Sequence, residues 1–152
     1  MVSPWLCRGF FGGQFNMPHS TTRVFVHLVF GVKNGEHWVT PEIQDALYRF
    51  MRGILQNLGC NVVTIHGVPN HVHLLFVLSR NLSLGQIVGR LKKSSTDWVK
   101  KQSDGFLHFA WQTGYGAFSV SYSDVELVKQ YIQNQQNHHK SVSFDDEILP
   151  TV

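Results

Sequence analysis

Two histidines, His71 and His73, stand two residues apart inside a run of apolar and β-branched residues. The turn signal Pro69-Asn70 precedes them, so the run is predicted to form a strand. Because side chains on a strand alternate between its two faces, both imidazoles are expected to point the same way. Two imidazoles on one face can bind a divalent metal ion together. The pair alone leaves a second interpretation open, in which both rings only form hydrogen bonds at the sheet surface.

A phenol and an amide, Tyr131 and Gln135, stand four residues apart near the C-terminal end of the chain. They lie in a segment, 125–139, that the capping pattern of Ser123 and Glu126 predicts to be helical. Side chains four residues apart on a helix share one face, about 5–6 Å from each other. A tyrosine has an ordinary pKa of about 10, so it is a nucleophile at neutral pH only where its phenolate is stabilised. The alternative is a half-buried Tyr131 whose hydroxyl simply reaches the surface.

The elements that must position these four residues follow the order β-α-β-β-α-β and then a further helix. They are strands at 23–30, 61–68, 71–77 and 106–121, the last with a turn or bulge, and helices at 41–58, 83–102 and 125–139. This order predicts an α+β fold of the ferredoxin-like type, an antiparallel sheet with helices packed on one side, plus a C-terminal helix that carries Tyr131. His27 lies in the apolar first strand, where we expect a hydrogen-bonded core residue that at most supports a ligand.

The composition allows one domain. A chain of 152 residues with 43% hydrophobic content can bury a stable core without disulfide bonds or a structural metal ion. Residues 1–16 are expected to be a disordered N-terminal extension, 17–144 the folded domain and 145–152 a short tail. Cys7 and Cys60 lack a paired or metal-binding spacing, which predicts a reducing, cytoplasmic location. No apolar run reaches the roughly 18 residues of a membrane span, so no membrane partner is expected.

The net charge is only +3, yet the stretch 80–101 alone carries a net charge of +5. A local basic stripe is the pattern expected for contact with a phosphate backbone. On the helix expected at 83–102, apolar residues recur at helical spacing and leave most basic residues on the outer face. The candidate nucleic-acid contacts are Arg90, Lys93, Lys100 and Lys101. A solvated helix face explains the same charges and stays an open alternative.

Three separated segments, 71–75, 111–121 and 131–139, resemble the single-tyrosine HUH transposases of the insertion-sequence 200/605 type, also called IS200-like transposases. They contain the His-Val-His strand, the aromatic and glycine-rich segment from Trp111, and the helix with Tyr131, Gln135 and a His-His pair. The resemblance covers about 17–144. Three motifs in the right order make it far more specific than the His-Val-His motif would be.

The resemblance implies a homodimer that cleaves and rejoins single-stranded DNA with hairpin ends through a 5′-phosphotyrosine intermediate. By position, Tyr131 matches the nucleophile, while His71, His73 and Gln135 match the ligands of a Mg²⁺ or Mn²⁺ ion. The resemblance also implies that the tyrosine helix serves the histidine pair of its own or of the partner subunit. One departure concerns Asn70, which stands where the family often has an aspartate.

Two other functions fit parts of the sequence. A single-stranded nucleic-acid-binding module of the RNA-recognition-motif type has the same element order, and 114–118 partly echoes its aromatic signature. A domesticated, inactive relative is the other alternative. The binding module leaves the histidine pair without a role, so a metal-dependent activity would separate it from a transposase. Of the other tyrosines, Tyr48, Tyr115 and Tyr122, none has an amide one helical turn later.

Overall fold

The computed structural model describes residues 20–135, so the expected extension at 1–16 and the tail at 145–152 lie outside the described residues. Four strands and three α-helices alternate in the predicted order, which confirms the α+β class. They are β1 (Phe25–Gly31), α1 (Pro41–Asn57), β2 (Asn61–Val68), β3 (His71–Val77), α2 (Leu84–Lys100), β4 (Gly116–Val120) and α3 (Val125–Gln133). Three short 3₁₀ helices join them: η1 (Lys33–Gly35), η2 (Asp104–Phe106) and η3 (Tyr122–Asp124). No helix within residues 20–135 is long and apolar enough to cross a membrane.

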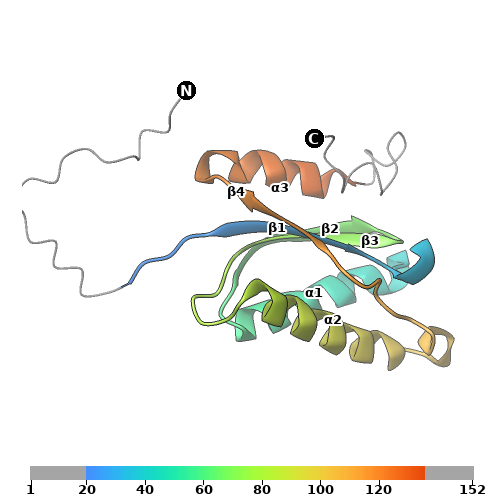
Figure 1. Ribbon diagram of the computed structural model, residues 1–152. Coiled ribbons are helices and arrows are strands. Elements are labelled where there is room, and N and C mark those ends of the chain that lie inside the picture. The colour runs from blue at the N-terminus through green and yellow to red at the C-terminus, as the bar shows by residue number, and fades with distance from the viewer. Residues whose placement is uncertain (1–19, 136–152) are drawn as a thin grey trace, which may run out of the picture.

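The strands form one antiparallel sheet in the order β2-β3-β1-β4. Helices α1 and α2 cover one face of this sheet, and α3 lies across the other (Figure 1). The main core fills the space between the sheet and α1 and α2, where alternate residues of the central strands point. Its residues on β1 and β3 are Val26, Leu28, Phe30, Val72, Leu74 and Phe76. The residues between them therefore face α3.

Helix α1 begins with Thr40 at the N-cap position and Pro41 in the first turn, as the sequence predicts. Its apolar stripe is buried against the sheet, and Gly59, with φ +79°, follows the end of the helix in the left-handed conformation that glycine tolerates. Helix α2 begins with a capping box in which Ser83 and Gln86 bond each other's backbone N–H groups. Both helices thus have ends that their own sequence specifies.

Tyr48 on α1 has a buried hydroxyl that finds no hydrogen-bond partner within residues 20–135. Burial, and secondarily the charge of Asp45, raises the pKa of Tyr48. We expect Tyr48→Phe to raise the free energy of unfolding by about 1 kcal/mol at neutral pH, because an unpaired buried hydroxyl is removed. The folded-state pKa lies above the unfolded value of about 10, so the wild type should lose more stability than the variant as the pH rises past that value. Urea denaturation at neutral and alkaline pH measures both effects.

One predicted strand and one predicted helix cap differ from the structure. The strand expected at 106–121 is confined to Gly116–Val120, because Phe109 and Trp111 before it are buried in the core as parts of a loop. The predicted capping box at Ser123 does not form either. The hydroxyls of Ser121 and Ser123 donate to the Asp124 carboxylate at 2.7 and 3.3 Å, and α3 starts after Asp124 without a side-chain cap.

Candidate active site

His71 and His73 begin strand β3 and point to the face of the sheet that α3 covers. Their alternation with the core residues Val72 and Leu74 places them there, which confirms the predicted shared face. Both side chains have 0% exposed area, and their ring centroids lie 5.1 Å apart. The sheet thus presents two close, fully buried imidazoles beneath the C-terminal helix.

Helix α3 brings Tyr131 to the histidine pair. The helix packs over β2 and β3 of its own chain, and the half-buried Tyr131 ring lies edge-on to His73 with 6.1 Å between ring centroids. Helix α3 ends at Gln133 with Asn134 as its C-cap, where the helix predicted over 125–139 is interrupted, and Gln135 is again in helical conformation. Gln135 thus lies two residues beyond the end of α3, and its side chain is fully buried. Residues 136–139 of the predicted helix lie outside the described residues.

Each of the two histidines uses its Nδ1 atom in a hydrogen bond. His71 Nδ1 lies 2.7 Å from Oδ1 of Asn70, and an amide oxygen only accepts, so the ring N–H donates. In a neutral ring this leaves the lone pair on Nε2. His73 Nδ1 lies 3.0 Å from Nε2 of His27, which reaches across from β1. Asn70, the departure from the family pattern, thus fixes the orientation of the His71 ring through its amide oxygen.

His27 contacts the histidine pair, where the sequence predicts a core residue that at most supports a ligand. Its ring stacks on His73 with 5.2 Å between centroids and an interplanar angle of 23°, and it lies edge-on to Tyr131 at 6.3 Å. Burial lowers the pKa of His27 to about 4, so the ring is neutral at neutral pH. His27 pairs in register with Leu75, one diagonal step from His73. Only the strand pairing, which the sequence does not specify, brings the two rings together.

The donor set of His71, His73 and Gln135 suits a divalent metal ion such as Mn²⁺, because imidazole nitrogen and amide oxygen are both accepted ligands. Within residues 20–135, no three or more His, Cys, Asp and Glu side chains form a group that could hold a metal ion. Of the ligands that the family resemblance implies, Gln135 is the one outside the histidine pair.

Residues 20–135 match the family model for IS200-like transposases, which is most of the chain. The chain belongs to the IS200-like transposases. Within this family, the ISDra2 transposase TnpA of Deinococcus radiodurans is 27% identical over 119 residues, and the match covers 73% of this chain and 83% of that protein.

Two solved structures share the fold. One is from Deinococcus radiodurans R1 and was described as a transposase, with a TM-score of 0.61, 22% identity, and coverage of 83% of this chain and 98% of that chain. The other is a REP-associated tyrosine transposase bound to a REP hairpin, with a TM-score of 0.61, 13% identity and 87% coverage of both chains. Both comparisons support assignment of the described domain to a transposase fold.

Gly67 on β2 lets the strand that carries the transposase's histidine pair approach closely. A Cβ atom at Gly67 would overlap the carbonyl oxygen of His71 and lie 2.9 Å from Cα of Val72. We expect Gly67→Ala to lower the free energy of unfolding by roughly 1–3 kcal/mol and to displace His71, because the obstructing atoms belong to the backbone. Gly53→Ala is the matched control: nothing lies within 4 Å of its Cβ, and alanine should stabilise helix α1. Thermal denaturation of both variants tests the difference.

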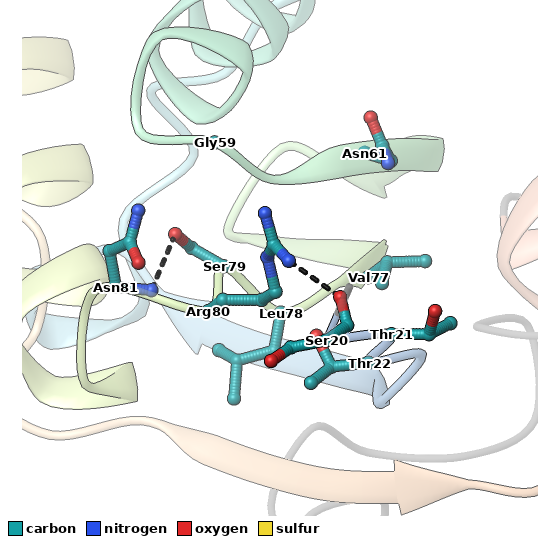
Figure 2. Close-up of a pocket in the computed structure, with 10 residues that line it drawn as sticks. All are labelled: Ser20, Thr21, Thr22, Gly59, Asn61, Val77, Leu78, Ser79, Arg80 and Asn81. Atoms are coloured by element: carbon teal, nitrogen blue, oxygen red, sulfur yellow. Dashed lines mark hydrogen bonds between the residues drawn. The ribbon is translucent and has the colours of Figure 1, made fainter. Parts of the chain in front are cut away.

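Two cavities lie at opposite ends of β3. One of about 720 Å³ lies before the start of β3 and is lined by Val32, Asn70, η1 and residues 110–113. The other, of about 410 Å³, is shown in Figure 2 and lies where β3 ends at Val77. There Arg80 donates a 2.7 Å hydrogen bond to the carbonyl oxygen of Ser20, which ties the start of the described chain to the β3–α2 connection. Of the two cavities, only the first is lined by a residue that bonds a candidate ligand, because Asn70 is hydrogen-bonded to His71.

The four candidate DNA contacts are exposed along α2 and just beyond it, on the opposite side of the sheet from Tyr131 (Figure 1). They therefore do not line the candidate active site. Lys92 on the same helix is different, because its Nζ donates to the carbonyl oxygens of Gln112 and Gly114 and lies over the Phe30 ring. Trp98 stacks on Phe50 at 5.3 Å, so it packs at the edge of the core.

Alanine at Arg90, Lys93, Lys100 and Lys101 together is expected to weaken binding of a DNA hairpin without altering the histidine pair. Each phosphate that the protein no longer neutralises should lower the slope of log affinity against log salt concentration by about 0.7–0.9. Fluorescence anisotropy over a salt series measures this slope. The control is Arg49→Ala, an exposed cation on α1 outside the basic stripe. An unchanged slope in the fourfold variant would mean that the stripe is only a solvated helix face.

Proposed function

We propose that this chain cleaves and rejoins single-stranded DNA at the ends of a mobile element through a covalent 5′-phosphotyrosine link at Tyr131. The observation that carries this proposal is the place of Tyr131, whose ring lies 6.1 Å from His73 over a pair of fully buried histidines. Membership of the IS200-like transposases supports the same reaction class. Of the described tyrosines, Tyr115 and Tyr122 are exposed and Tyr48 lies on α1, behind the sheet.

In the proposed step, the Tyr131 oxygen attacks the scissile phosphorus in line with the leaving 3′ oxygen. A bond forms between the phenolic oxygen and phosphorus, the bond from phosphorus to the 3′ oxygen breaks, and the proton lost by the phenol is balanced by the proton gained at the new 3′ hydroxyl. The phosphodiester energy stays in the covalent link, so a second 3′ hydroxyl can reverse the step and join the strands. No nucleotide cofactor is required.

His71, His73 and Gln135 are the residues we propose to hold Mg²⁺ or Mn²⁺. Such an ion, when bound, would polarise the scissile phosphate and stabilise the charge that develops on it. The protein residues supply the orientation: β3 fixes the two imidazoles, and α3 holds the phenol above them. Mixed nitrogen and oxygen ligands bind Mn²⁺ more tightly than Mg²⁺, so Mn²⁺ should act at the lower concentration.

The proposed substrate is single-stranded DNA with hairpin ends, and the proposed active form is a homodimer. The structural neighbour bound to a REP hairpin supports the hairpin, and the exposed cations of α2 offer a surface for its phosphates. For the homodimer, support comes from apolar side chains exposed around the edge strand β4 and α3: Phe118 is 37%, Tyr122 73% and Leu127 69% exposed. The sheet order β2-β3-β1-β4 supports the ferredoxin-like arrangement, with α3 as the added helix.

A covalent-adduct assay tests the proposed function. Purified protein is mixed with Mn²⁺ or Mg²⁺ and a pool of single-stranded hairpin oligonucleotides labelled at their 3′ ends, and the products are separated on a denaturing gel. The label must be at the 3′ end because the segment downstream of the cut is the one that becomes linked. A metal-dependent protein–DNA adduct is expected. Hairpin binding that gives no adduct would instead favour an inactive, DNA-binding relative.

A further inference from the structure

His27 contacts both a proposed metal ligand, His73, and the proposed nucleophile, Tyr131. From β1 its Nε2 atom reaches Nδ1 of His73 at 3.0 Å, and its ring stacks on the His73 ring. The same ring packs against Phe118 of β4 at 6.1 Å and lies edge-on to Tyr131. Contacts on several sides fix the direction in which the His27 nitrogen points.

The hydrogen bond between the two rings holds a single proton, and its position decides what His73 can do. If Nδ1 of His73 carries the proton, the lone pair of that ring is on Nε2 and can bind a metal ion. If Nε2 of His27 carries it, Nδ1 of His73 accepts and Nε2 of His73 is protonated, so that nitrogen cannot be a ligand. The direction of this one hydrogen bond therefore controls the proposed metal site.

We propose that His27 is a positioning residue that accepts a hydrogen bond from His73 Nδ1–H and so holds His73 in its metal-binding tautomer. This inference rests on the proposed function. The arrangement at His71 supports it, since the Asn70 oxygen can only accept and therefore fixes the matching tautomer there. With both Nδ1 atoms donating, the two rings present equivalent Nε2 atoms. Acceptors behind metal-binding histidines commonly have this effect on ligand orientation.

Nuclear magnetic resonance on the metal-free wild-type protein tests the direction of the bond. With ¹⁵N-labelled histidine, the two ring nitrogens of His73 have chemical shifts that report which one carries the proton. We expect the proton on Nδ1. A proton on Nε2 of His73 would overturn the inference, and this result does not depend on DNA cleavage.

Two variants test the effect on metal binding. His27→Leu removes the acceptor, whereas His27→Gln restores an acceptor oxygen. Calorimetry with Mn²⁺ alone is expected to show a dissociation constant raised about 10- to 100-fold in His27→Leu and largely recovered in His27→Gln. Wild-type affinity in a folded His27→Leu variant would overturn the inference. If that variant fails to fold, the tautomer of His73 in the wild-type protein decides whether the inference holds. A wild-type protein that binds no Mn²⁺ would contradict the metal part of the proposed function, whatever the tautomer.

Discussion

Tyr131→Phe is expected to abolish the covalent protein–DNA adduct, with a loss of at least about 1000-fold, because it removes only the oxygen that forms the new bond. The phenylalanine ring keeps the edge-on packing against His73 and His27, so the fold and the affinity for hairpin DNA should be unchanged. The denaturing-gel assay measures the adduct, and anisotropy measures the binding.

Tyr48→Phe is the matched control for this prediction. It removes a phenolic hydroxyl on α1, on the other side of the sheet from Tyr131 and the histidine pair. Adduct formation by this variant should match the wild type. An adduct that persists in Tyr131→Phe at wild-type yield would show that another residue is the nucleophile.

Alanine at both His71 and His73 is expected to reduce Mn²⁺ affinity and adduct yield by at least about 100-fold. Substitution of a residue that only orients a metal ligand already lowers metal affinity or activity about 10- to 100-fold. Treatment of the wild type with a chelator should give the same loss, which added Mn²⁺ should reverse. The double variant should not recover when Mn²⁺ is added. Calorimetry and the adduct assay report the two effects separately.

His108→Ala is the control for the double variant, because His108 is an exposed histidine in the loop before β4. It should retain both metal affinity and adduct yield. The two buried rings also pack beneath α3, so their removal costs stability, and thermal denaturation must show that the double variant is folded. Full cleavage by a folded double variant would mean that the reaction does not use the histidine pair.

The sequence predicts those parts of the fold that depend on local patterns. Strand β2 and the histidine strand β3 begin where turn residues place them, and the capped helix α1 begins where its proline does. The shared face of His71 and His73 follows from strand alternation alone. The aromatic segment before β4 is less predictable, because residues that favour strands also fill a core from a loop. Phe109 and Trp111 do the latter.

The less predictable parts of the site depend on contacts between distant segments. His27 reaches His73 only because β1 pairs with β3 in one particular register. The sequence predicts the basic residues on α2 as DNA contacts, but the chain topology places that helix on the face of the sheet opposite Tyr131. The sequence predicts one continuous helix through Tyr131 and Gln135, whereas α3 is interrupted between them at Asn134, its C-cap.

The placement of α2 and α3 on opposite faces of the sheet has a consequence for DNA geometry. Each helical layer packs about 10 Å from the sheet, so a strand that contacts both the basic stripe and Tyr131 must span at least about 20 Å around a sheet edge. At about 3.4 Å per stacked nucleotide, this corresponds to about six nucleotides. The position of cleavage would then depend on its distance from the foot of the hairpin as well as on the bases at the cleavage site.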